Sequence, residues 1–153
     1  MTHHANAKLQ QWLDQEVPEE VLEPDLPIID PHHHLWDLRT FTIQPHASFE
    51  QKVYLCEEIV EDISAAGHKV TQTVFAQCAA FYRAQGPEAM RCVGETEFVH
   101  GIVAMSNSGV YGDTQLCAGI FGSADLRAGK SVGEVLQAHL AASPNFRGVR
   151  TAF

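Results

Sequence analysis

The sequence predicts an α/β fold in which about four parallel strands are joined by crossover helices. Short apolar segments alternate along the chain with longer segments whose apolar residues recur every three or four positions. Strands that alternate with helices pair in parallel, because each helix returns the chain to the end of the sheet where the previous strand began. Two architectures satisfy this pattern: an open, doubly wound sheet and part of a (β/α) barrel.

Composition limits the classes of protein and of partner. The 153 residues suit one domain, and 45% are hydrophobic. The formal net charge of -9 argues against nucleic acid or an anionic membrane as a partner. Neither a long apolar run nor a secretory signal is visible, so we expect a cytoplasmic protein. We expect reduced, mostly buried thiols at the widely spaced cysteines Cys56, Cys78, Cys92 and Cys117.

Residues 1–27 are expected to precede the main domain, which we place at 28–153. Residues 7–17 show helical spacing of apolar side chains, which predicts a short amphipathic helix. Residues 17–27 hold three prolines and four acidic residues, and they predict an extended connector. The first strand is predicted over 28–32.

The next segment predicts a loop and then a helix. Residues 35–48 show no clear period, so we expect a loop there. Residues 50–66 predict a helix that ends at Gly67. The apolar stripe of that helix is expected at Leu55, Ile59 and Ile63.

A second strand and a long helix follow. Residues 70–77 are rich in β-branched and aromatic residues, which predicts a strand. A loop is expected over 78–86. Pro87 is expected to begin a helix that runs to about Ser106. Its apolar residues are Met90, Val93, Phe98, Ile102 and Met105.

The last part of the chain repeats the alternation. The apolar run 116–121 predicts a third strand. Ser131 is expected to cap a helix that ends at about Ala142. Residues 146–151 predict the fourth strand.

The segment Asp30-Pro31-His32-His33-His34 at the end of the first strand is the main candidate site. Side chains at i and i+2 of a strand share a face, so Asp30, His32 and His34 are expected on one side and His33 on the other. Two imidazoles side by side form half of a divalent-metal site. Asp30 is then either a partner for a ring N–H or a third ligand. The alternative is a surface cluster of histidines.

The position of these histidines favours the barrel over the doubly wound sheet. A dinucleotide-binding sheet has a glycine-rich turn after its first strand, whereas this chain has histidines there. In barrels the chemistry lies at the carboxyl ends of the strands.

The segment PIIDPHHHLWD resembles the amidohydrolase superfamily, and within it the amidohydrolase-related family of metal-dependent hydrolases, lactonases and decarboxylases. The likeness continues through VFAQ, FYRAQGPEAMR, CAGIFGSADL and FRGVR. The resemblance implies a (β/α)8 barrel that holds one or two divalent metals, commonly zinc, with His32 and His34 as ligands. This chain is similar to the N-terminal half of such a barrel, apparently truncated after its fourth strand. The remaining ligands and the catalytic acid are therefore expected beyond Phe153, and the chain by itself is expected to have negligible activity.

The resemblance implies an enzyme that acts on a small-molecule substrate, a cyclic ester, an amide or a carboxylated compound. Decarboxylation on the same scaffold is an alternative. A hypothesis from another class is a non-catalytic remnant that binds metal or self-associates as a homo-oligomer.

Three other residues are candidates for substrate binding. Gln77 ends the second strand, where it either contacts substrate or satisfies backbone groups. Tyr82 lies in the following loop and either lines a pocket or is solvated. Arg150 lies nearer the carboxyl end of its strand than Arg147, on the opposite face, and its guanidinium suits a carboxylate or carbonyl. Structural roles are expected for His68, His100, His139 and Asp125, and His46 is a weaker candidate for touching substrate.

Overall fold

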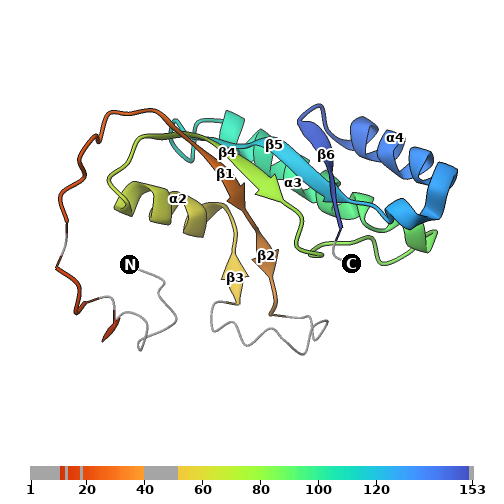
Figure 1. Ribbon diagram of the computed structural model, residues 1–153, viewed down its shortest axis with the longest axis horizontal. Coiled ribbons are helices and arrows are strands. Elements are labelled where there is room, and N and C mark those ends of the chain that lie inside the picture. The colour runs from red at the N-terminus through yellow and green to blue at the C-terminus, as the bar shows by residue number, and fades with distance from the viewer. Residues whose placement is uncertain (1–10, 13, 18, 40–51, 152–153) are drawn as a thin grey trace.

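The protein is described by a computed structural model over residues 11–12, 14–17, 19–39 and 52–151. This part of the chain forms an α/β fold whose main sheet has four parallel strands in the order β1-β4-β5-β6. The strand order in the sheet follows the order along the chain, and helices connect successive strands (Figure 1). The predicted parallel sheet with crossover helices is therefore confirmed.

The four strands lie close to the predicted ranges. They are β1 (Ile28–His33), β4 (Val70–Ala76), β5 (Gln115–Ser123) and β6 (Phe146–Arg150). Strand β5 is longer than the predicted 116–121, because backbone pairing with β4 and β6 extends past the apolar run into small and polar residues.

In the described residues from 52 onward, the α-helices that cover the sheet are α2 (Cys56–Ala65), α3 (Val93–Asn107) and α4 (Val132–Ala142). Helix α2 begins later than predicted, at a turn where Glu58 accepts a hydrogen bond from the N–H of Leu55 at 2.8 Å. The predicted stripe of α2 is confirmed, since Ile59 is buried and Leu55 and Ile63 pack beside it.

The starts of α3 and α4 differ from the predictions. Pro87 precedes a short 3₁₀ turn at Glu88–Met90, and α3 begins only at Val93. Within α3, Val99, Ile102 and Val103 face the core, and Met105 of the predicted apolar set is exposed. Ser131 precedes α4, but its hydroxyl donates to the carbonyl of Ala128 at 2.8 Å and so does not cap the helix.

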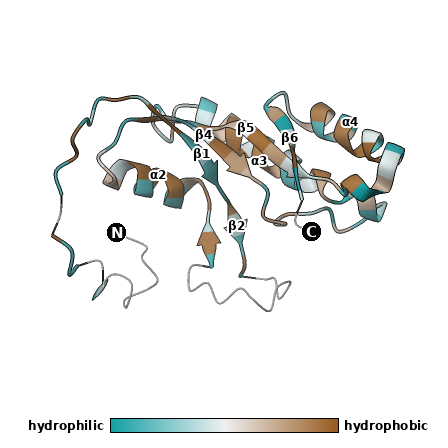
Figure 2. Ribbon diagram, viewed as in Figure 1, coloured by the Kyte–Doolittle hydropathy of each residue, from teal (hydrophilic) through white to brown (hydrophobic). Residues whose placement is uncertain are grey.

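The core lies between the helices and one face of the sheet. Helices α2 and α3 share a single apolar cluster with β4 and β5, and α4 packs against α3. Figure 2 shows β4 and β5 as hydrophobic strands and the carboxyl end of β1 as hydrophilic. The fully buried residues of this cluster include Phe75, Val99, Leu116 and Ile120. Alternate strand residues face away from the helices, and among these Phe121 is 39% exposed.

The backbone of β5 at Gly122 packs closely against the His139 ring of α4. A Cβ at Gly122 would lie 2.9 Å from the ring of His139. That ring is fully buried, stacks on Phe146, and bonds through Nδ1 to the Thr96 hydroxyl at 2.8 Å. Its Nε2 donates to the carbonyl of Ser123 at 2.9 Å. The structural role predicted for His139 agrees with these contacts.

A small second sheet forms where the sequence predicted a loop and, further along, the start of a helix. Trp36–Asp37 (β2) pairs antiparallel with Val53–Tyr54 (β3), and the rings of Trp36 and Tyr54 stack with centroids 5.0 Å apart. The pair extends from the carboxyl end of β1 (Figure 1). The predicted loop is therefore wrong at its start, because an aromatic cross-strand contact stabilises pairing in segments too short to show a period.

The N-terminal predictions are only partly covered by the described residues. Gln11 and Trp12 are helical, and the rest of the predicted 7–17 helix lies mostly outside them. Residues 19–27 form neither helix nor strand, as expected for a connector. None of the helices in the described ranges has the length and apolar character that crossing a membrane requires.

Candidate metal-binding site

The backbone of β1 is irregular where the histidines begin. The pairing of β1 with β4 shifts register between Asp30 and His33. The Asp30 carboxylate accepts a hydrogen bond from the N–H of His32 at 3.0 Å. This bond fixes the backbone that carries His32, and it does not test the predicted role of Asp30 as a partner for an imidazole or a third ligand. The register shift interrupts the simple alternation of the strand at this point.

The rings of His32 and His34 converge, as the i, i+2 spacing predicts. Their Nε2 atoms are 3.3 Å apart, and the ring planes are nearly perpendicular, at 87°. His34 is half-buried and His32 is exposed. The pair lies at the carboxyl end of β1, beside the end of β4.

The neighbours of the two rings decide which nitrogen carries the proton. The carbonyl of Ala76 lies 2.6 Å from His34 Nδ1 and can only accept, so Nδ1 carries the hydrogen and Nε2 presents a lone pair. Arg150 Nη1 lies 3.3 Å from His32 Nε2 and can only donate, so that nitrogen also presents a lone pair. Two lone pairs therefore face the same small region, which favours a positive charge there. Burial lowers the pKa of His34, which favours its neutral form.

The separation of the two nitrogens fits a zinc ion. Two tetrahedral ligands at about 2.0–2.1 Å from zinc have nitrogens about 3.3–3.4 Å apart, and the pair here is 3.3 Å apart. The bond from His34 to Ala76 is the kind of contact that fixes a ligand's tautomer. No cluster of three or more His, Cys, Asp or Glu side chains suited to a metal occurs within the described ranges. His32 and His34 are thus the two described residues whose nitrogens are placed to hold such an ion.

His33 points to the other side, as predicted, and is 8% exposed. Its Nε2 lies 2.9 Å from the hydroxyl of Thr73, and burial lowers the pKa of His33 to about 4. Thr73 also accepts a hydrogen bond from the N–H of Cys117 at 2.9 Å, and Cys117 has a φ of 55° in the middle of β5. This buried cluster supports the backbone beneath the histidine pair.

Arg150 and Gln77 meet beside the pair, but Gln77 takes part through its backbone. Arg150 Nη2 donates to the carbonyl oxygen of Gln77 at 2.5 Å. The Gln77 side chain accepts from the N–H of Ala79 at 3.1 Å, which is the backbone-satisfying alternative. Arg147 lies an odd number of residues from Arg150 and so faces the other side of the strand. Its guanidinium donates to the carbonyl of Pro144 at 2.8 Å.

Tyr82 lies near the same edge of the sheet. It is 37% exposed, burial raises the pKa of its hydroxyl, and its side chain interacts with Ser123. Ser123 is the register partner of Arg150 in the pairing of β5 with β6.

Glu95 is a residue that the sequence interpretation missed. It lies in the first turn of α3, is 1% exposed, and its Oε1 accepts hydrogen bonds from the N–H groups of Cys78 at 3.0 Å and Ala80 at 2.9 Å. Its Oε2 is buried with no hydrogen-bond partner in the described structure. The available signal was the helical spacing of Glu95 from Val99 and Ile102, which places an acidic residue on the helix face that packs inward.

The remaining candidates lie apart from the pair. His100 Nδ1 is 3.1 Å from the hydroxyl of Ser143, and Asp125 accepts from the N–H of Arg127 at 3.0 Å, which agrees with structural roles. His68 is exposed. His46 lies outside the described residues.

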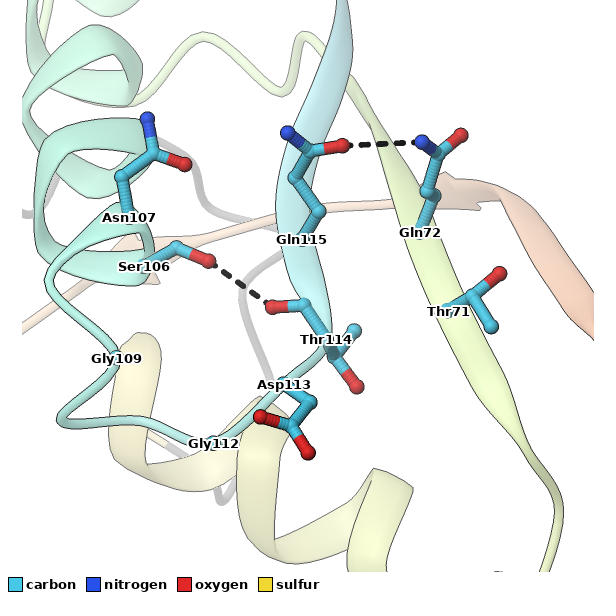
Figure 3. A pocket seen from close by; sticks show the side chains of 9 residues that line it. All are labelled: Thr71, Gln72, Ser106, Asn107, Gly109, Gly112, Asp113, Thr114 and Gln115. Carbon is cyan, nitrogen blue, oxygen red and sulfur yellow. Dashed lines mark hydrogen bonds between the residues drawn. The ribbon is translucent and has the colours of Figure 1, made fainter.

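A polar cavity of about 410 Å³ lies at the opposite end of the strands from the histidines. Figure 3 shows it at the amino ends of β4 and β5, where Gln72 Nε2 donates to Gln115 Oε1 at 3.0 Å. Ser106 and Asp113 also line it, from the end of α3 and the loop that follows. The cavity is therefore separate from the candidate metal site.

Comparison with known proteins does not add to this description. No family model, curated protein or solved structure matches the chain significantly.

Proposed function

We propose that this chain carries the metal-binding part of a metal-dependent hydrolase of the amidohydrolase type. The observation that supports this most directly is the 3.3 Å separation of His32 Nε2 and His34 Nε2, both of which present a lone pair, although Arg150 Nη1 lies 3.3 Å from His32 Nε2. His32 and His34 would hold the metal, most suitably zinc, and the carbonyl of Ala76 would keep His34 in the ligating tautomer.

We infer further that the sheet forms the first four strands of a (β/α)8 barrel. The strand order follows the chain without the reversal of a doubly wound sheet, and the helices pack on one face. The histidines stand at the carboxyl end of β1, where barrel enzymes place their chemistry. Arg150 on β6 also reaches His32 on β1, which supports strong curvature at that end of the sheet.

The proposed substrate is a small cyclic ester or amide, or a carboxylated compound. Arg150 is exposed and directs a guanidinium at the region beside the two imidazoles. A guanidinium binds a carboxylate or carbonyl oxygen through paired N–H groups, so Arg150 would orient the substrate. A bound zinc ion supplies polarisation of the carbonyl and a bound water whose pKa falls toward about 7.

The test is a calorimetric zinc titration of the full chain after metal has been removed with a chelator. We expect one zinc site that His34→Ala or His32→Ala weakens at least about tenfold, since each removes one of two ligands. The matched control is His68→Ala, which removes an exposed histidine far from the pair. Unchanged zinc affinity in both ligand variants would overturn the proposal.

The chain also has His3 and His4 near its start, and such residues can bind zinc nonspecifically. The titration is therefore repeated in the His3→Ala/His4→Ala background. Zinc binding that disappears in this background and persists in His34→Ala also contradicts the proposed site.

A further inference from the structure

One peptide group beside the candidate site is held at both ends by charged side chains. The carbonyl of Gln77 accepts from Arg150 Nη2 at 2.5 Å, and the N–H of Cys78 in the same peptide group donates to Glu95 Oε1 at 3.0 Å. Peptide bonds in the described part of the chain are trans, so this C=O and N–H point in opposite directions. Glu95 and Arg150 therefore lie on opposite sides of one peptide group.

The signs of the two charges match the peptide dipole. The carboxylate lies at the N–H end, which is positive, and the guanidinium lies at the carbonyl end, which is negative. Both charges polarise the peptide in the same sense, so each hydrogen bond strengthens the other. The arrangement links Glu95 to Arg150 through one peptide group of the backbone.

Glu95 also fixes the loop that contains this peptide. Its Oε1 accepts a second hydrogen bond, from the N–H of Ala80 at 2.9 Å. The intervening Ala79 has a φ of 62°, a left-handed conformation that is unfavourable for alanine and needs support from its surroundings. The N–H groups of Cys78 and Ala80, on either side of Ala79, therefore form a concave anion site that the chain fills with its own carboxylate.

We propose that Glu95 is a positioning residue that acts through the Gln77–Cys78 peptide group to hold the Arg150 guanidinium beside the histidine pair. The functional meaning of this placement rests on the substrate-binding role proposed above for Arg150. The coupling between Glu95 and Arg150 is a separate property that does not require a metal.

The surroundings of Glu95 allow the coupling to be changed by pH. Burial raises the pKa of Glu95 to about 7, although the hydrogen bonds from backbone N–H groups oppose this rise. The other titratable or charged groups that face it are Cys78, Tyr82, Cys92 and Arg150. A protonated Glu95 keeps its shape but loses the charge that polarises the peptide group.

The test is a double-mutant cycle with Glu95→Gln and Arg150→Gln in the full chain. Unfolding by urea is measured at pH 8 in the presence of a chelator, so that zinc does not contribute. If the residues are coupled, the unfolding constant of the double variant differs from the value expected for independent changes by at least about threefold. An unfolding constant of the double variant within about twofold of the value expected for independent changes overturns the proposal.

The control cycle replaces Glu95→Gln with Glu97→Gln. Glu97 lies on the same helix, and its side chain is 46% exposed and paired with Arg83. The same change of charge at Glu97 is expected to be independent of Arg150. Coupling of equal size in this control would mean a general electrostatic effect and would contradict the proposal.

A second measurement needs no variant and applies even if Glu95→Gln does not fold. In the unaltered chain with chelator, nuclear magnetic resonance follows the Arg150 side-chain N–H and the Cys78 backbone N–H across pH 5.5–8.5. We expect both signals to shift with one midpoint near the pKa of about 7 assigned to Glu95. An Arg150 signal that does not move with that of Cys78 overturns the proposal.

The two proposals fail in different ways. If the histidines bind zinc but the double-mutant cycle is additive, only the proposed role of Glu95 is rejected. A coupled cycle without zinc binding would remove only the metal site.

Discussion

Arg150 and His32 lie on the two edge strands of the four-stranded sheet, yet their side chains meet. Arg150 Nη1 is 3.3 Å from His32 Nε2, although strands β4 and β5 lie between β6 and β1 in the sheet. The contact sets a cation beside the nitrogen that is proposed to bind metal. Arg150 would therefore compete with a metal ion for the lone pair of His32 Nε2, and it is also a candidate for binding substrate.

Arg150→Gln is therefore expected to raise the affinity for zinc by about tenfold, because a single positive charge about 5 Å from a divalent ion opposes binding by about 1–2 kcal/mol in water. Calorimetric titration at low ionic strength measures the change. The control is Arg147→Gln, which removes a guanidinium bonded to Pro144 on the other face of β6. Equal affinities of Arg150→Gln and the unaltered chain would show that the guanidinium does not face the ion.

Thr73→Val is expected to lower the free energy of unfolding by about 2–4 kcal/mol, because it removes the hydroxyl that hydrogen-bonds two buried groups. These groups are His33 Nε2 and the N–H of Cys117. Urea denaturation followed by circular dichroism measures the loss. The control Thr71→Val removes one hydrogen bond to the carbonyl of Ile28, and it should cost about 1 kcal/mol. A smaller loss at Thr73 than at Thr71 would contradict the buried network.

Gly122→Ala is expected to destabilise the protein by about 1–3 kcal/mol, because the added methyl group overpacks the interface of β5 with α4. The new Cβ would lie 2.9 Å from the ring of His139, which is held on several sides. Thermal unfolding of the two proteins gives the difference. Gly101→Ala in α3 is the matched control, since a Cβ there meets nothing within 4 Å. That helical substitution should stabilise by about 0.5–1 kcal/mol.

Glu95 is expected to make stability fall as pH rises. Burial raises its pKa in the folded chain from 4.5 to about 7, so the folded state binds a proton more tightly than the unfolded state. The contribution of Glu95 to the free energy of unfolding is thus fully present below pH 4.5 and is lost as pH rises through about 7, by up to about 3 kcal/mol.

Urea denaturation of the unaltered chain and of Glu95→Gln across pH 4–8.5 tests this dependence. The stability of Glu95→Gln relative to the unaltered chain should increase with pH over that window, because the glutamine does not ionise. Glu97→Gln, at an exposed position of the same helix, is the control. A constant difference between Glu95→Gln and the unaltered chain would show that Glu95 ionises with an ordinary pKa.

The strands and helices could be predicted because they depend on local periodicity. The β-branched run 70–77 and the stripe at Ile59 each need only their own segment to define an element. The convergence of His32 and His34 is also local, since it depends on a spacing of two residues at the carboxyl end of β1.

The rest depends on contacts between segments far apart in sequence, which periodicity does not report. The pairing of β2 with β3 needs Trp36 to meet Tyr54 across a long connection. The anchoring of Arg150 needs a backbone carbonyl of Gln77, which carries no sequence signal at all. Glu95 was missed because an acidic residue in a helix is normally exposed, and only its contacts with the loop after β4 identify it as buried.

The agreement between strand order and chain order has a kinetic consequence. Each of β4, β5 and β6 adds to a strand that precedes it along the chain, so the sheet can grow in one direction from β1. The contact between His32 and Arg150 spans 118 residues and can form only when β6, the fourth strand of the described sheet, has docked. Fraying of β6 would separate the Arg150 guanidinium from the imidazoles while β1 and β4 stay paired. The contact of Arg150 with His32 would therefore have a different lifetime from the contact between His32 and His34.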